Sequence, residues 1–321
     1  MVNKPELIHF QLTRNCNLRC YFCGQWGKKG FFSGADGEEM ALSDWKKLAL
    51  DIKDTYTPLP HIMLWGGEPL VCPYFDELVM FLKEQGFTLG MITNGVLLDE
   101  HMEICKASFK KIFVSIDGPT DVHDSIRGDG VFEKVMNNLA KLSDSDVYIT
   151  VSSVLSPDLL DRLGEFVSLM ENSGAEELLL QNYIRVSKEE AEEYKKWMKD
   201  CFDIKATEID SWIFQLPEDY EGKKEKVIDE IKDKKFKIKV SYLPHNNEDC
   251  ICMSANKHIH VSWKGNVLYC TDFYDFSAGN VKEQHIDKIF NNEISEAYRN
   301  NVKNNPTCKH CSWRPSKEYW L

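Results

Sequence analysis

Six short apolar runs alternate with five amphipathic stretches between residues 6 and 183, and this alternation constrains the fold more than any other feature. The runs have the length of β-strands and lie at residues 7–12, 61–65, 87–93, 111–116, 147–154 and 178–183. The stretches between them have helical periodicity and lie near residues 43–55, 74–85, 99–105, 131–142 and 157–173. Ser43 and Asp44 are N-cap candidates for the first helix.

Strands separated by helices predict repeated βα units on one parallel sheet, which makes this an α/β fold. Because such crossovers are right-handed, the sheet curls toward a barrel or an open doubly wound form. In both forms the ligand site lies at the carboxyl ends of the strands.

The rest of the chain has a different character. Two charged helical stretches, 187–200 and 223–233, enclose an apolar island at 210–214, which predicts a connector that covers one edge of the first domain. Further on, 257–263 and 266–271 predict a hairpin, and helices are expected near 284–290 and 294–302. We therefore expect three units, at residues 1–183, 184–249 and 250–321.

Composition narrows the class of protein. The chain of 321 residues is 43% hydrophobic and 28% charged, which is typical of a globular protein, and its net charge of -12 argues against broad nucleic-acid binding. The N-terminus lacks the apolar core of a signal peptide, and no apolar run approaches membrane-spanning length. We expect no membrane partner and a cytoplasmic location, where the eleven cysteines would stay reduced.

Three of these thiols fall within eight residues, as Cys16-x3-Cys20-x2-Cys23 after the first apolar run. An iron–sulfur cube usually takes four protein thiolates, and so does a closed zinc site. Three thiols with no local fourth suggest a metal centre with one open position, and an open position invites an external ligand. The alternative is a zinc knuckle that a distant Cys or His completes.

A second group of thiols lies near the C-terminus. It supplies the four thiolates that a closed metal site needs, with a structural zinc site as the alternative: Cys252, Cys270, Cys308 and Cys311. Cys250 is a fifth thiol, which can be a substitute ligand, a hydrogen donor or a bystander.

The first cysteine motif, with Phe22 before its third thiol, resembles that of the radical SAM superfamily. The resemblance implies a [4Fe–4S] cluster on Cys16, Cys20 and Cys23 whose fourth iron binds S-adenosylmethionine (SAM). It also implies an oxygen-sensitive enzyme that cleaves SAM to a 5′-deoxyadenosyl radical, which abstracts hydrogen from a substrate. The fold implied for residues 1–183 is a partial (β/α)6 TIM barrel.

Strand-end segments continue the resemblance. Trp65-Gly66-Gly67-Glu68-Pro69 is similar to the GGEP motif that contacts the methionine amino group, where Glu68 can pair with an ammonium, and Thr93-Asn94-Gly95 is similar to the TNG segment. Ser115-Ile116-Asp117-Gly118 and Arg127 resemble the segment that holds the methionine carboxylate. The SAM contacts implied are Phe22, Gly66, Gly67, Glu68, Pro69, Thr93, Asn94, Ser115, Asp117, Arg127, Ser153 and Leu180, with Gln181 beside adenine.

The C-terminal part resembles the auxiliary-cluster extension called SPASM, in its shorter Twitch form, because Cys252-x12-Gly265-x4-Cys270 and Cys308-x2-Cys311 match its fingerprint. This implies an α+β domain with a second [4Fe–4S] cluster on Cys252, Cys270, Cys308 and Cys311. The arrangement is similar to that of the butirosin aminocyclitol dehydrogenase and of anaerobic sulfatase-maturating enzymes.

An auxiliary cluster with four cysteine ligands favours a role as electron acceptor, and hence an oxidation, for which Asp272 is the candidate base. Epimerisation is the alternative, with Cys201 or Cys250 as hydrogen donor. Because the first strand begins by residue 7, we expect no leader-binding element and favour a small polar metabolite, such as a sugar or aminocyclitol, over a peptide. A flavodoxin or ferredoxin is the expected reductant. A zinc-stabilised binding module and a simple iron–sulfur electron carrier remain as other classes.

Overall fold

The computed structural model describes residues 4–27, 30–34, 37–232, 234–242, 252–308 and 311. Its centre is a nine-stranded sheet in the order β7-β6-β5-β4-β3-β2-β1-β8-β9. All neighbours pair in parallel except β8 and β9, which form an antiparallel hairpin. The strands are β1 Leu7–Gln11, β2 His61–Trp65, β3 Leu89–Thr93, β4 Phe109–Ser115, β5 Tyr148–Val154, β6 Glu177–Gln181, β7 Lys239–Tyr242, β8 His258–Val261 and β9 Val267–Leu268.

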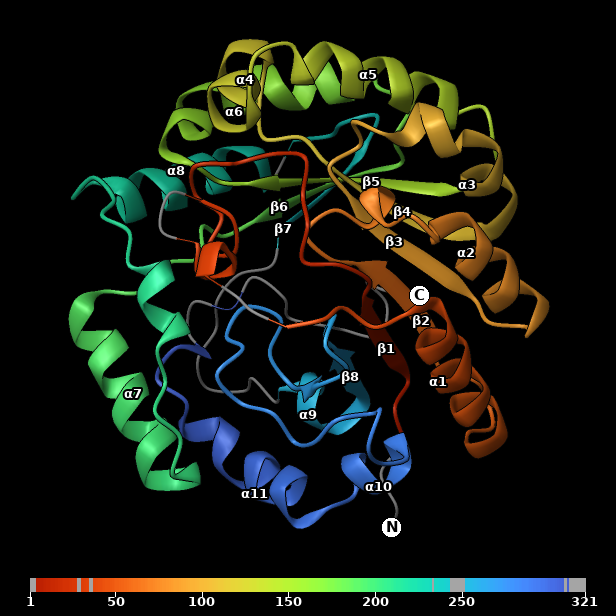
Figure 1. The fold of residues 1–321 in the computed structure, drawn as a ribbon. Coiled ribbons are helices and arrows are strands. Elements are labelled where there is room, and N and C mark those ends of the chain that lie inside the picture. Colours follow the sequence, from red (N-terminus) through yellow and green to blue (C-terminus); the bar gives the residue numbers. More distant parts are fainter. Residues whose placement is uncertain are drawn as a thin grey trace.

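Helices cover the outer face of this sheet (Figure 1). Those of the first five βα units are α1 Leu42–Thr55, α2 Phe75–Glu84, α3 Met102–Ser108, α4 Thr120–Arg127, α5 Val131–Leu142 and α6 Pro157–Met170, with α4 and α5 both after β4. The later helices are α7 Lys188–Phe202, α8 Tyr220–Lys232, α9 Met253–Lys257, α10 Ile286–Phe290 and α11 Glu293–Asn301. Short 3-10 turns are η1 Phe31–Gly34, η2 Pro69–Val71, η3 Leu98–His101, η4 Glu208–Trp212 and η5 Val302–Asn304.

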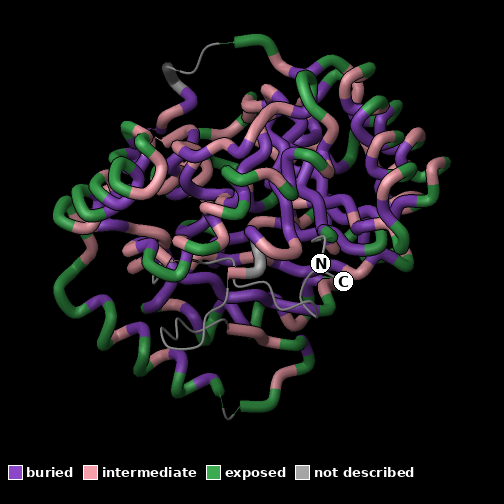
Figure 2. Tube along the Cα trace, turned by 90° about the horizontal axis from the view of Figure 1, so that it is seen from below, coloured by how far each residue is buried: buried purple, intermediate pink, exposed green. Residues whose placement is uncertain are grey.

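The main hydrophobic core lies between the sheet and these helices, where Trp45, Phe75 and Phe166 are fully buried. The opposite face of the sheet carries a smaller cluster of Leu7, Met63, Phe113 and Leu179, which come from strands β1, β2, β4 and β6 and fill the concave side. Figure 2 shows the buried residues running through the strands and the exposed ones following the outer helices. The predicted partial barrel is therefore confirmed, as an open curved sheet with an added C-terminal part.

Several local predictions were wrong. Helix α1 has Ala41 as its N-cap in place of Ser43 or Asp44, and Asp44 Oδ2 instead accepts the Ala41 N–H from inside the first turn, at 2.9 Å. Helix α4 and strand β7 had no predicted counterpart. Strand β7 pairs with β6, so the connector predicted at 184–249 adds a strand to the sheet as well as covering its edge.

The predicted hairpin of the C-terminal part is present as β8 and β9, and β8 also pairs in parallel with β1. Helix α10 packs against α1, and α11 packs against α7 and α9. The C-terminal part is thus joined to the barrel through a shared sheet, while the exact domain limits stay a prediction. No helix in the described part of the chain is long and apolar enough to cross a membrane.

Candidate active site

A cavity of about 230 Å³ lies at the carboxyl ends of the barrel strands. Each of the strands β1 to β6 ends at it or leads into a loop that lines it, as parallel βα architecture predicts. Two residues from outside the six units, Trp212 and Asp272, complete its wall. The lining residues that matter below are Cys16, Cys20, Phe22, Cys23, Trp26, Gly66, Gly67, Glu68, Thr93, Asn94, Ser115, Arg127, Gln181, Asn182, Tyr183, Trp212 and Asp272.

The cysteine loop follows β1 and presents all three thiols to this cavity. The backbone N–H groups of Leu18 and Trp26 donate to the sulfurs of Cys16 and Cys23, at 3.4 and 3.3 Å. Burial raises the pKa of Cys16 to about 12 and that of Cys20 to about 11. The thiolate forms therefore need a compensating positive charge, which a bound metal centre supplies.

Two glycines after β2 allow close packing against this loop. A Cβ on Gly66 would lie 2.6 Å from the Thr13 carbonyl oxygen, and one on Gly67 would lie 2.2 Å from that of Asn15. Their backbone instead hydrogen-bonds there, since Gly67 N donates to Thr13 O at 2.9 Å. The glycines thus bring the end of β2 against the cysteine loop, a contact that the sequence did not reveal.

Glu68 is buried and holds neighbouring strand ends together. One carboxylate oxygen accepts from Leu70 N at 3.2 Å and from the Thr93 hydroxyl at 2.7 Å, and the other accepts from Asn94 N at 2.7 Å. Burial raises the pKa of Glu68 to about 7, although these hydrogen bonds oppose the shift. Both oxygens are engaged within the chain, whereas the sequence suggested an ammonium partner.

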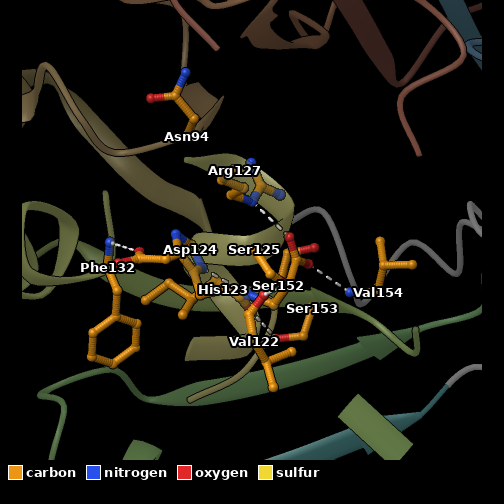
Figure 3. Close-up of polar contacts among 12 residues, drawn as sticks. Asn94, Val122, His123, Asp124, Ser125, Arg127, Phe132, Ser152, Ser153 and Val154 are labelled. Carbon is orange, nitrogen blue, oxygen red and sulfur yellow. Dashed lines mark hydrogen bonds and ion pairs between the residues drawn. The ribbon is translucent and has the colours of Figure 1, made fainter. Parts of the chain in front are cut away.

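Arg127, at the end of α4, lines the cavity and forms an ion pair with Asp117. Its Nε donates to Asp117 Oδ2 at 2.6 Å, and Val154 N donates to Asp117 Oδ1 at 3.0 Å (Figure 3). The Asp117 carboxylate is fully buried, so it fixes the guanidinium relative to β5. The pair leaves Arg127 at the cavity wall, where it can contact an anionic group.

Four predicted SAM contacts, all in the described part of the chain, lie outside the cavity lining: Pro69, Asp117, Ser153 and Leu180. Pro69 begins η2 and is buried. The Ser153 hydroxyl donates to Ile116 O, and Leu180 belongs to the main core. Gln181, one residue further along β6, lines the cavity instead, because successive strand residues face opposite sides.

The second set of thiols, Cys252, Cys270, Cys308 and Cys311, shares one buried environment. Burial raises the pKa of Cys311 well above its usual value, and the nearby charges of Asp272 and the other three thiols raise it further. The Cys311 N–H donates to Cys308 O at 3.2 Å. Among the described residues, no three His, Cys, Asp or Glu side chains converge to hold a single metal ion.

The three residues predicted to act in catalysis have different surroundings. Asp272 is only 7% exposed and lines the cavity, two residues after Cys270. Cys201 lies on α7, where its thiol contacts Asn301 Oδ1 at 3.6 Å, and it is not part of the cavity wall. Cys250 lies outside the described residues.

Trp212 is the main residue that sequence reasoning missed. Its indole N–H donates to the Asp272 carbonyl at 2.9 Å, and its ring lies against Gly24, next to Cys23. Asn182 and Tyr183 after β6 were also not predicted as lining residues. The apolar island at 210–214 was a usable signal for Trp212, but only folding brings it to the two cysteine-bearing loops.

Both thiol sets fit iron–sulfur clusters, because soft thiolates are the preferred ligands and the first set faces a cavity with room for a further ligand. The family model described as the radical SAM superfamily matches residues 10–170, about half of the chain. This chain belongs to the radical SAM superfamily. The model described as an iron–sulfur cluster-binding domain, SPASM, matches residues 250–312. The enzyme therefore uses SAM and two [4Fe–4S] clusters.

The similar proteins carry out varied chemistry. An AdoMet-dependent heme synthase of Methanosarcina barkeri is 24% identical over 98% of this chain and 90% of its own length. Streptococcus suis SuiB bound to precursor peptide SuiA has a TM-score of 0.70 at 16% identity, covering 97% of this chain and 71% of SuiB. BtrN in complex with AdoMet and 2-DOIA has a TM-score of 0.52 at 16% identity, covering 98% of both chains. At such identities the structures establish a shared fold.

Proposed function

We propose that this radical SAM enzyme oxidises a small polar metabolite, such as a sugar or aminocyclitol, at a carbon that carries a hydroxyl group. The observation that carries the proposal is Asp272, a buried carboxylate in the wall of the cavity that also contains Cys16, Cys20 and Cys23. Asp272 also lies near Cys270 and Cys311, whose pKa values are raised by burial and raised further by the charge of Asp272. A proton acceptor therefore stands close to both cysteine sets, as coupled proton and electron removal requires.

The chain offers a residue for each part of this assembly. Cys16, Cys20 and Cys23 would hold the SAM-binding cluster, and the four later cysteines would hold the auxiliary one. SAM would lie against Phe22, the Gly66–Glu68 backbone, Thr93, Asn94, Ser115 and Gln181, with Arg127 toward its carboxylate. The other predicted SAM contacts lie outside the cavity lining and would support the lining residues from the layer behind them: Pro69, Asp117, Ser153 and Leu180. When bound, these groups supply a 5′-deoxyadenosyl radical for hydrogen abstraction and an electron acceptor.

Asp272 would take the hydroxyl proton while the carbon–oxygen bond becomes a carbonyl. The substrate then loses one hydrogen atom, one proton and one electron, which amounts to a two-electron oxidation. Trp212 would position the base, because its hydrogen bond to the Asp272 carbonyl fixes that loop beside the cysteine loop. Epimerisation would instead need a hydrogen donor in the cavity. Of the two thiols predicted for that role, Cys201 lies outside the cavity wall and Cys250 lies outside the described residues.

The experiment combines the reconstituted enzyme, SAM and a reductant with a panel of sugars and aminocyclitols under anaerobic conditions. We expect one class to increase 5′-deoxyadenosine formation and to yield a product two mass units lighter. Asp272→Asn should keep 5′-deoxyadenosine formation and lower product formation about 10²–10⁴-fold, the usual contribution of a general base, and Asp272→Glu should recover part of it. Full product formation by Asp272→Asn would refute the role of this base.

A second candidate is modification of a peptide or protein side chain. Its support is the SuiB structure with precursor peptide SuiA, which has a higher TM-score than BtrN. The structure of BtrN in complex with AdoMet and 2-DOIA, which this chain matches over 98% of both chains, supports the first candidate. Product formation from a synthetic peptide, with none from the metabolite panel, would favour the second.

A further inference from the structure

Three cationic side chains beside the cysteine loop rest on aromatic rings. The Arg14 guanidinium carbon lies 5.1 Å from the centroid of the Trp263 ring, and Lys264 Nζ lies 4.6 Å from the same ring. The Arg19 guanidinium carbon lies 4.3 Å from the Trp26 ring centroid. We call Arg14, Arg19 and Lys264, with these two rings, the cationic patch.

Among the described residues, no close ion pair neutralises the charges of the patch. Burial raises the pKa of Glu208 to about 7, and the charge of Lys264 only opposes that rise. Within the described ranges, none of its three cations has a carboxylate oxygen within 4 Å. The carboxylate that contacts this segment, Glu39, accepts from the Thr13 hydroxyl at 2.8 Å and from the Arg14 backbone N–H at 2.9 Å, so it is bound to other groups. Arg19 is exposed and the other two are half-buried, which leaves charge available to a partner.

The patch is also connected to the first cluster site. Trp26 N donates to the Cys23 sulfur at 3.3 Å, and the Trp26 indole N–H donates to Arg14 O. Arg19 Nη1 donates to Cys16 O at 2.7 Å. The Phe32 ring lies 6.0 Å from that of Trp26 and 6.3 Å from that of Trp263, so one aromatic cluster links both halves of the patch.

The net negative charge of the chain limits where an acidic partner can bind. At a net charge of -12 the chain repels acidic proteins in general, and an acidic partner can approach only where cations dominate locally. Cations held over rings keep their charge and lose little freedom on binding. The SAM-binding cluster needs one electron from outside for each SAM cleavage, and two cations of the patch, Arg14 and Arg19, lie next to and within its ligand loop.

We propose that the cationic patch is the docking surface for an acidic one-electron carrier protein of the flavodoxin or ferredoxin class. The carrier loses one electron, the cluster on Cys16, Cys20 and Cys23 gains it, and no atom is transferred. This inference rests on the cofactors and is independent of the substrate.

The test measures binding of an acidic flavodoxin to the reconstituted enzyme by isothermal titration calorimetry at low and high salt. In parallel, 5′-deoxyadenosine formation is driven either by reduced flavodoxin or by dithionite, which needs no docking surface. The variants are Lys264→Glu and Arg19→Gln. The matched control is Lys110→Glu, because Lys110 is exposed at the amino end of β4, opposite the cysteine loop.

We expect Lys264→Glu to raise the Kd for flavodoxin about tenfold at low salt, and Arg19→Gln to raise it by less, since steering by local charge acts on association. In Lys264→Glu the flavodoxin-driven rate should fall with binding while the dithionite-driven rate stays unchanged, and Lys110→Glu should match the parent in both. High salt should weaken parent binding and reduce the differences. Unchanged Kd values for both patch variants, or an equal loss in Lys110→Glu, would overturn the proposal. Absence of dithionite-driven 5′-deoxyadenosine would instead count against SAM cleavage and leave the binding result valid.

Discussion

Gly24→Ala tests whether the 184–249 segment is truly part of the active site. A Cβ at residue 24 would lie 2.3, 2.5 and 2.6 Å from three ring carbons of Trp212. Carbon atoms in good contact are about 3.5–4.0 Å apart, so the ring or the loop must move by about 1 Å. The ring is buried, and its N–H is anchored to Asp272 O, so it cannot simply rotate away.

Overpacking of this kind costs about 1–3 kcal/mol. For a chain of this size we expect Gly24→Ala to lower the Tm by about 2–10 °C, measured by circular dichroism on the reconstituted enzyme. Gly164→Ala is the control, because a Cβ there meets nothing within 4 Å in the middle of α6. It should stabilise the protein by about 0.5–1 kcal/mol.

A double-mutant cycle makes the argument specific. Trp212→Ala alone should cost about 3–5 kcal/mol, as removal of a buried tryptophan does. In that background the methyl group of Gly24→Ala has room, so the double variant should be no less stable than Trp212→Ala. A coupling of about 1–3 kcal/mol is therefore expected. Strict additivity, or a Gly24→Ala variant with an unchanged Tm, would refute the contact.

Two further predictions concern buried ionisable groups. Burial lowers the pKa of His258 to about 4 and that of His260 to about 3, from 6.5. Between these folded-state pKa values and the unfolded value of 6.5, only the unfolded chain takes up a proton. The contribution of each histidine to the free energy of unfolding is therefore fully present above about pH 6.5 and falls by about 1.4 kcal/mol per pH unit as the pH drops below it. Buried Glu68, whose pKa is raised to about 7, takes up a proton in the folded state over the same range and acts in the opposite direction. The test therefore compares the parent with His260→Gln by urea unfolding at pH 7 and 5.5. The parent should lose about 1 kcal/mol more than the variant on this change of pH, and an equal loss in the two proteins would contradict the prediction. Asp117→Asn should cost about 3–5 kcal/mol because it leaves the buried Arg127 charge without its partner. Asp121→Asn removes the exposed partner of Arg162 and should leave the urea midpoint almost unchanged. Similar urea midpoints for these two variants would show that the buried pair does not hold α4.

Elements with a strong local pattern were predictable. Strand β2 was expected at 61–65 and helix α5 at 131–142, and both have these limits. Helix α4 was missed because it is short and polar, and its burial of Val122, His123 and Ile126 accompanies the ion pair between Asp117 and Arg127. Strand β7 was missed because its residues are only half-buried or exposed, so no apolar run marks it.

The cysteine spacing by itself indicated a metal centre with one open position and left zinc as an alternative, because ligand type and local spacing are properties of a few adjacent residues. The kind of cofactor followed from the resemblance of the cysteine motif and the strand-end segments to the radical SAM superfamily. The sequence also determined the parallel βα order, since strand and helix periodicities are local. Only the tertiary structure decided that β8 pairs with β1 and that Trp212 joins Gly24 and Asp272. It also decided that both carboxylate oxygens of Glu68 accept hydrogen bonds at the end of the neighbouring strand, from Thr93 and Asn94. Such contacts join segments far apart in the chain, and their partners are selected by packing and burial, which no local pattern records.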